Sequence, residues 1–290
     1  NLVTRISPSP AALANAAAWH AGEAHSIGGG QEWELKALGA FSGNNLCQSV
    51  WRHNITQRHF YYPLEWDSLI AMDAPKNAHV VGAGDFDGDG RYDLLILDDN
   101  TRDIYVDLKM DGKPVLPIDM TWRGAPLNWK FITASDFNGD GKDDILAHTD
   151  ETAQVFLMNG SRVIGGGLVA QTAQNDDSGD SGWFVEAAAD FDDDDKADLI
   201  WRNIYSGAIY IDTKASNGEM NLEHPVYLGG DDRFNTVACG DYNGDGSVDI
   251  MMASKRSAEI FYMFGVNVGE ALTTSLLDDP AWRIVDPETP

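Results

Sequence analysis

A nine-residue acidic segment recurs four times along the chain, and this repeat constrains the fold more than any other feature. In each copy Asp or Asn occupies the first, third, fifth and ninth positions, and an aromatic residue occupies the second. The copies begin 51, 54 and 51 residues apart. A unit of about 50 residues that repeats in register predicts a solenoid or a propeller. The segments, termed acidic loops one to four, are Asp85–Asp93, Asp136–Asp144, Asp190–Asp198 and Asp241–Asp249.

Strand-like sequence flanks every acidic loop. An apolar or aromatic residue stands eight positions before the loop aromatic, which predicts a short strand leading into the loop. An apolar run such as Leu94–Ile96 follows the loop directly, and a third strand comes after a polar turn. With a looser fourth segment, the unit is a four-stranded meander. One aromatic marks each third strand: Tyr105, Phe156, Tyr210 and Phe261.

Two weaker copies extend the repeat to both ends of the chain. One precedes acidic loop one and has Ser42, Asn44 and Gln48 where the others carry Asp or Asn. The other is split, because residues 1–30 resemble the later strands of a unit and residues 282–285 resemble a first strand. Complementary ends are what closure of a ring of blades requires.

We therefore predict an all-β fold, a six-bladed β-propeller of four-stranded blades, closed by N- and C-terminal strands that share one blade. The whole chain, 1–290, is then a single domain. The alternative is an open array cut from a longer protein. The predicted blades are residues 1–30 with 280–290, then 31–74, 75–124, 125–179, 180–231 and 232–279.

The acidic loops have the composition of calcium sites. Calcium takes six to eight oxygen ligands, and carboxylates at alternating positions of a tight loop converge on one point. Positions 1, 3, 5 and 9 offer side chains and position 7 offers a backbone carbonyl, so we expect about four calcium ions. The predicted ligands are Asp85, Asp87, Asp89, Arg91 and Asp93; Asp136, Asn138, Asp140, Lys142 and Asp144; Asp190, Asp192, Asp194, Lys196 and Asp198; and Asp241, Asn243, Asp245, Ser247 and Asp249.

The four sites are not equivalent. Asn138 and Asn243 each replace one carboxylate, so loops two and four should bind calcium more weakly. In loop three Asp195 replaces the glycine found at the same position of the others, and aspartate tolerates left-handed backbone better than most residues. The alternative for all four loops is a set of Asx-turns, in which the aspartates accept hydrogen bonds from nearby amides.

Composition excludes some functions. The formal net charge of −26 argues against nucleic-acid binding, which needs a positive surface, and fits a cation-binding protein in a secreted, extracellular or cell-surface setting. No run of eighteen apolar residues exists, so no membrane span is expected. Cys47 and Cys239 are equally compatible with a bridge and with two buried apolar residues.

These loops and flanks resemble the FG-GAP/VCBS repeat family, whose members include integrin α-subunit propellers, propeller lectins and modules of secreted bacterial proteins. Trp51-Arg52 and Trp201-Arg202 resemble the Trp-Arg pair that often follows the loop in bacterial members. The resemblance implies that calcium locks the loop between the first two strands of each blade. Integrin-type and mushroom-lectin propellers usually have seven blades, so their ligand sites do not transfer directly to a six-bladed chain.

The sequence gives the ligand only as a class. No catalytic or nucleotide-binding motif is found, and His53 and His59 are expected to be solvated in a turn. Trp66 and Trp122 are off the repeat pattern, and with Arg123 they are the candidate residues for stacking on a sugar. We expect a non-catalytic module that binds a glycan, as a lectin does, or a protein in cell adhesion. The alternatives are a polysaccharide lyase or hydrolase and a structural module of a larger surface protein or toxin. The oligomeric state is left open.

Overall fold

The computed structural model describes residues 33–42, 48–62, 70–72, 77–108, 125, 127, 129–148, 152–171, 182–213, 226–230, 233–240, 247–254, 259–263 and 271–275. Within these ranges the regular structure is all β, with nineteen strands and no helix. The strands form five antiparallel sheets, each built from strands consecutive in sequence.

The sheets, numbered one to five along the chain, are as follows. Sheet one holds β1 (Trp33–Gly39), β2 (Gln48–His53), β3 (His59–Tyr62) and β4 (Ile70–Ala71). Sheet two holds β5 (Ala78–Gly84), β6 (Asp93–Asp98) and β7 (Ile104–Asp107). Sheet three holds β8 (Lys130–Ser135), β9 (Asp144–His148), β10 (Thr152–Asn159) and β11 (Arg162–Gln171). Sheet four holds β12 (Trp183–Ala189), β13 (Asp198–Asn203), β14 (Ala208–Asp212) and β15 (Val226–Gly230). Sheet five holds β16 (Phe234–Gly240), β17 (Asp249–Ser254), β18 (Glu259–Met263) and β19 (Ala271–Ser275).

The first strand of every sheet contains a β-bulge at the same position. The pairing between first and second strands skips one residue in all five sheets, although the residue types differ. A bulge bends its strand and redirects a side chain. The skipped residues are Lys36, Val81, Ile132, Glu186 and Val237.

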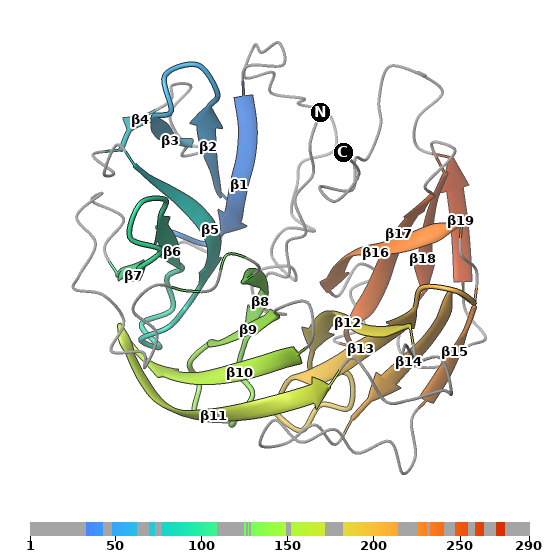
Figure 1. Cartoon of the computed structure of the whole chain (residues 1–290). Helices are drawn as coiled ribbons and strands as arrows, with labels where there is room; N and C mark the ends of the chain where they lie inside the picture. Colours follow the sequence, from blue (N-terminus) through green and yellow to red (C-terminus); the bar gives the residue numbers. More distant parts are fainter. Residues whose placement is uncertain are drawn as a thin grey trace.

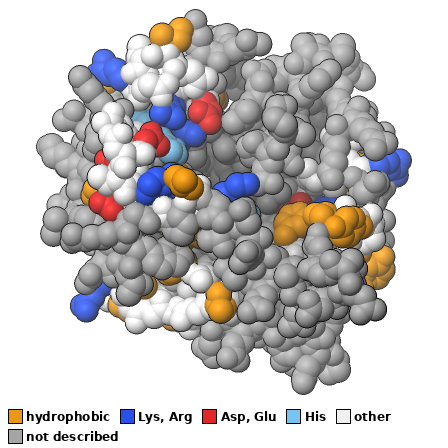
Figure 2. All heavy atoms as spheres, in the orientation of Figure 1, with side chains coloured by type: hydrophobic (Ala, Val, Ile, Leu, Met, Phe, Trp, Pro, Cys, Tyr) orange, Lys and Arg blue, Asp and Glu red, His pale blue; other side chains and the backbone are white. Residues whose placement is uncertain are grey.

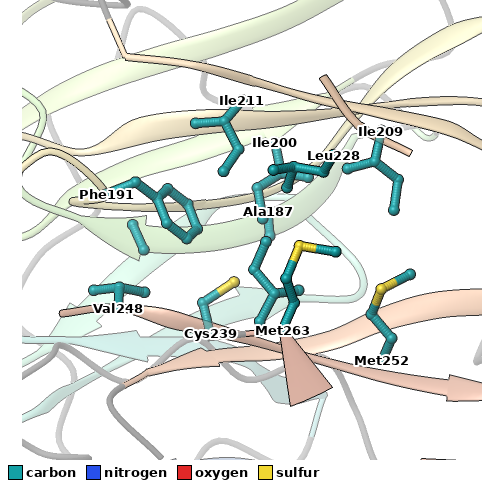
Figure 3. Close-up of a cluster of buried hydrophobic side chains, with 12 residues drawn as sticks. Ala187, Phe191, Ile200, Ile209, Ile211, Leu228, Cys239, Val248, Met252 and Met263 are labelled. Carbon is teal, nitrogen blue, oxygen red and sulfur yellow. The ribbon is translucent and has the colours of Figure 1, made fainter. Parts of the chain in front are cut away.

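Apolar side chains hold consecutive sheets together face to face. Four buried clusters each join two neighbouring sheets: one with two, two with three, three with four, and four with five. In the last of these, Ile200 and Ile211 of sheet four face Met252 and Met263 of sheet five (Figure 3). Cys239 lies in the same cluster as a free, buried thiol. Burial of two apolar faces between sheets is the main stabilising term of such an arrangement.

The sheets follow one another around a common centre (Figure 1). First strands of consecutive sheets touch, in the order β1, β5, β8, β12 and β16. First strands toward the centre and sheets packed in sequence order make the fold propeller-like. The meander predicted from the sequence is confirmed by four sheets of four strands. Residues 1–32 and 276–290, which include the predicted split blade (1–30 with 280–290), lie outside the described residues, so six blades and the single 1–290 domain stay predictions.

Candidate metal sites

Acidic loops one to three, which the structure describes, each wind around the carboxylate at the first position. In loop one, Asp85 Oδ1 accepts hydrogen bonds from the backbone amides of Gly88 (2.8 Å) and Asp89 (3.1 Å), and Oδ2 accepts from Gly90 (2.8 Å). Asp136 does the same in loop two, with 2.7 Å bonds from both Gly139 and Gly141. The Asx-turn arrangement is thus present, and it places the following side chains around one point.

The aspartate at position 9 connects the end of the loop to its start through a hydrogen bond. Its Oδ2 atom accepts the backbone amide of the loop aromatic, at 2.9 Å in loops one and two and 2.8 Å in loop three. This bond joins the start of the second strand to the end of the first. The three aspartates are buried: Asp93, Asp144 and Asp198.

The carboxylates are close enough to share a cation. Oxygen atoms of Asp85, Asp87 and Asp89 lie within 4.8 Å of one another, as do those of the equivalent acids in loop three, Asp190, Asp192 and Asp194. In loop one, Asp93 Oδ1 is buried and has no hydrogen-bond partner among the described residues. Unpaired buried oxygens and converging carboxylates fit a hard cation such as calcium.

Loop two reaches a similar arrangement with an amide. Asn138 Nδ2 donates to Asp140 Oδ2 (3.3 Å), while the Asn138 Oδ1 atom is buried without a partner in the described part of the chain. The amide therefore presents its oxygen and not its nitrogen as a possible ligand.

Burial, and secondly the neighbouring carboxylates, raise the pKa values of the aspartates at position 9 of loops one to three. Burial, with the nearby loop carboxylates, raises the pKa of Asp93 and of Asp198 to about 8. The pKa of Asp144 rises to about 7, again mainly through burial. A cation in the loop offsets this repulsion and favours the ionised form.

One contact in loop one competes with a cation. Arg91, whose carbonyl is a predicted ligand, turns its side chain back so that Nε lies 3.0 Å from Asp89 Oδ2. This hydrogen bond is the leading cause of a lowered pKa at Asp89. Both groups are solvent-accessible, so the pair is weak and its exchange for a calcium ligand costs little.

Left-handed backbone shapes all three loops. Gly88 and Gly90 have φ of 77° and 82°, and loop two repeats this with Gly139 and Gly141. Loop three instead uses Asp193 (φ 60°) and Asp195 (φ 66°). Asp195 therefore adopts the left-handed backbone conformation expected of it, and Asp193 adopts the same conformation.

The loops are linked to one another across the sheets. The backbone amide at position 8 donates to the position-1 carbonyl of the preceding unit: Asp143 to Asp85 (2.8 Å) and Ala197 to Asp136 (2.7 Å). Tyr92 makes the same bond to Ala40 of the degenerate first unit, at 3.3 Å. Asp143 adds a second bond, since its buried Oδ2 accepts the Asp85 amide at 2.8 Å.

In the degenerate unit, side-chain hydrogen bonds take the place of the carboxylate cluster. Gln48, buried at position 9, accepts the Ser42 amide at 3.1 Å, and its Nε2 donates to Ser42 Oγ. Neutral partners thus close this loop without charge. Asn44 lies outside the described residues.

Several predicted site residues cannot be placed. In loop four only Ser247 and the buried Asp249 fall within the described ranges, whereas Asp241, Asn243 and Asp245 lie outside them. Trp66, Trp122 and Arg123, the candidate sugar-binding residues, also lie outside the described residues. Their assignment stays a prediction.

Polar side chains that the repeat pattern did not indicate lie toward the opposite end of the sheets. His59 was expected in a solvated turn, and this is wrong: it is 1% exposed at the start of β3. Its Nε2 accepts the Val80 amide of sheet two at 3.3 Å. In sheet four, Glu186 Oε2 accepts from Arg202 Nε (2.7 Å), and Oε1 accepts the Thr236 amide of sheet five (3.2 Å). The His59–Val80 contact joins sheets one and two, and the Glu186–Thr236 contact joins sheets four and five.

The fold and its loops define a class: a repeat protein of small antiparallel sheets, of which sheets two to five carry an acidic loop after the first strand. A sequence profile described as FG-GAP-like repeat matches residues 85–147, 136–201 and 190–252. These matches together span more than half of the chain, and the chain belongs to the FG-GAP-like repeat family. No curated protein sequence matches it.

Solved structures with partial likeness include three proteins of different kinds. A chain of the Photorhabdus luminescens Tc holotoxin pore is 14% identical over 82% of this chain, with a TM-score of 0.37. This chain spans only 14% of that toxin chain. A quinonprotein alcohol dehydrogenase-like protein from Bacteroides thetaiotaomicron is 10% identical, with a TM-score of 0.42 and coverage of 86% of this chain and 67% of that one. YCF48 from Cyanidioschyzon merolae is 8% identical, with a TM-score of 0.43 and coverage of 86% and 87%. At these identities and TM-scores, the likenesses bear on neither function nor blade number.

Across the part of the chain that the structure describes, no helix has the length and apolar character needed to cross a membrane.

Proposed function

We propose that the chain is a calcium-stabilised, six-bladed propeller that acts outside the cell or on its surface as a non-catalytic binding module. The supporting observation is the shared geometry of three acidic loops, together with the backbone bonds that run from each loop to the preceding unit. Such a series links the sheets at one end of the fold. A cation in each loop would stiffen both its own sheet and the adjoining interface.

Calcium suits these loops better than magnesium. Asp85, Asp87, Asp89 and Asp93 would supply carboxylate oxygens and Arg91 its carbonyl, a flexible oxygen-rich set that calcium accepts. Magnesium demands near-octahedral geometry and keeps several waters. Loop two, with Asn138 in place of a carboxylate, should have lower affinity than loop one.

The opposite end of the sheets is left for a ligand. Metal loops that stabilise the fold need not contact the ligand, and the turns between second and third strands lie at the other end of each sheet. A glycan or a protein partner is the expected ligand; Trp66, Trp122 and Arg123, the candidate contacts from the sequence, lie outside the described residues. The fold class alone does not choose between these partners.

Thermal unfolding with and without divalent cations tests the calcium proposal. A ligand that binds only the folded state adds about 2.7 kcal/mol per independent site at a hundredfold excess over Kd. EDTA should therefore lower Tm markedly, and calcium should restore it better than magnesium does. Unchanged melting in both EDTA and calcium would refute the proposal.

Two variants sharpen this experiment. Asp87→Ala removes a ligand from loop one and should reduce the calcium stoichiometry measured by isothermal titration calorimetry. Asp103→Asn changes an acid outside the acidic loops and should leave the stoichiometry unchanged. Equal loss in both variants would indicate non-specific binding to the acidic surface.

A further inference from the structure

Sheets one and four share a local design around a Trp-Arg pair. Trp51-Arg52 and Trp201-Arg202 hold the same places on β2 and β13, opposite first strands with identical register. The bulge residue of the first strand is Lys36 in sheet one and Glu186 in sheet four. The two sheets can therefore be compared residue by residue.

In sheet four the arginine forms a buried ion pair with a carboxylate. Arg202 Nε donates to Glu186 Oε2 at 2.7 Å, with the two side chains 3% and 0% exposed. Arg202 Nη1 also donates to the Gly207 carbonyl at 3.4 Å. The charges are paired out of contact with water.

In sheet one the equivalent carboxylate is missing. Lys36 takes the place of Glu186, and Arg52 Nε is a buried atom without a hydrogen-bond partner among the described residues. The far end of Arg52 is held by the residue that corresponds to Gly207, because Nη2 donates to Gln57 Oε1 in a solvent-exposed contact. Arg52 as a whole is partly exposed, so solvent reaches the end of the guanidinium group while Nε is covered.

Among the described residues, no carboxylate accepts a hydrogen bond from Arg52 Nε in the way that Glu186 accepts one from Arg202 Nε. Lys36 Nζ lies 2.8 Å from Glu34 Oε1, so this pair is nearly neutral. His59 is buried, and burial together with the charges of Arg52 and Lys36 lowers its pKa to about 4, so the imidazole is neutral near pH 7. On β5, His79 Nδ1 lies 2.7 Å from Asp99 Oδ1.

We infer that Arg52 and Lys36 form a binding site for the carboxylate of an acidic sugar, a uronate. The carboxylate would take the place that Glu186 occupies in sheet four, and Arg52 Nε would donate to it. Planar guanidinium groups match carboxylate oxygens in geometry as well as in charge. The Glu186–Arg202 pair of sheet four thus shows how a carboxylate is held at the corresponding position.

Sugar hydroxyls suit the rest of the site better than an acidic peptide does. Glu34 provides acceptor oxygens beside Lys36, and Asp99 provides them beside His79. These carboxylates would repel a second carboxylate but accept a hydroxyl. The net charge of −26 also opposes a polyanionic peptide. Figure 2 shows basic, acidic and histidine side chains gathered on one face over β1 and β5. This inference rests on the proposed binding function and names its ligand class.

Calorimetric titration of the full chain in saturating calcium and low salt tests the inference. Glucuronate should bind, whereas glucose, which lacks the carboxylate, should not. Arg52→Gln should weaken glucuronate binding by about tenfold or more. Arg162→Gln, which changes an exposed arginine on β11, is the matched control and should bind like the original chain.

Lys36→Glu is the most discriminating variant. It supplies the carboxylate that sheet four already has, so glucuronate binding should be lost while Tm is kept or raised. Preserved Tm separates this result from misfolding. Unchanged glucuronate binding in either Lys36→Glu or Arg52→Gln would overturn the inference.

Three other outcomes would also contradict it. Equal binding of glucose would show that charge is not recognised, and tighter binding of a pentaglutamate peptide than of glucuronate would point to a protein partner. Absence of glucuronate binding with calcium-dependent melting intact would reject the sugar site alone. Loss of calcium dependence would instead reject the proposed calcium-stabilised module.

Discussion

His59 is a polar residue at a position where three other sheets carry isoleucine and sheet three carries Ala153. Ile104, Ile209 and Ile260 hold the same place on their third strands. The neutral imidazole is kept because its Nε2 accepts the Val80 amide between sheets one and two. Protonation would remove this acceptor and place a charge beside Arg52 and Lys36.

The lowered pKa of His59 gives a prediction with a definite sign. Its pKa is about 4 in the fold against 6.5 for a free histidine, so the unfolded chain binds more protons between these values. The contribution to the unfolding free energy therefore falls as pH drops through this window, by up to about 3 kcal/mol. His59→Gln keeps an acceptor without titrating. Urea unfolding at several pH values should show a smaller loss for the variant, and identical pH profiles would contradict the assignment.

For the Glu186–Arg202 pair, the prediction concerns the loss of stability when one charged partner is removed. Removing one partner leaves a buried charge uncompensated, which typically costs about 3–5 kcal/mol. Glu186→Leu should therefore lower the unfolding free energy by roughly that amount. The double variant Glu186→Leu with Arg202→Met should recover most of the loss, measured by urea unfolding. A double variant as unstable as the single one would show that the Thr236 contact, not the charge, is decisive.

At the level of the loop, neighbouring units restrict some glycines more than others. Gly88 and Gly90 both have positive φ, yet a Cβ on Gly88 would lie 3.2 Å from Lys142 Cγ and from the Gly141 carbonyl oxygen of loop two. A Cβ on Gly90 would meet nothing within 4 Å among the described atoms. The same loop thus holds one glycine for backbone conformation alone and one for conformation and contact.

Alanine substitution separates these two effects. Gly90→Ala should cost about 1–2 kcal/mol, the strain of left-handed backbone in an L-residue. Gly88→Ala should cost more, because loop two must also move away. Thermal unfolding of both variants in EDTA measures the difference without a calcium contribution. An equal loss of stability in the two variants would mean that loops one and two are not in close contact at Gly88 in solution.

The elements divide into those that sequence predicts and those that it does not. Acidic loops and flanking strands were predictable because ligand charge and alternating burial impose residue types at fixed spacing. The bulges were not, since Lys36, Val81 and Glu186 share a backbone conformation but no chemistry. His59 was misplaced because a histidine after a polar turn looks solvated until its neighbour in sheet two is known.

For the whole molecule, the five described sheets form a series in which each interior sheet is covered on two faces. Sheets two, three and four each contribute to two apolar clusters, whereas sheets one and five contribute to one each. Ends of such a series need a cover. The split repeat at the two termini is the candidate for that cover, which makes closure of the ring a property of residues far from the acidic loops.

Truncation tests closure directly. Removing residues 280–290 takes away the predicted first strand of the split blade, so an apolar face should become exposed and Tm should fall by several degrees, about what a loss of 1–3 kcal/mol produces. A synthetic peptide of residues 280–290 should restore Tm when added in trans, because the missing strand would pair with the N-terminal segment. A scrambled peptide of the same composition is the control. If truncation leaves melting unchanged, or if both peptides act alike, the chain is an open array and its acidic loops link only neighbouring pairs of sheets.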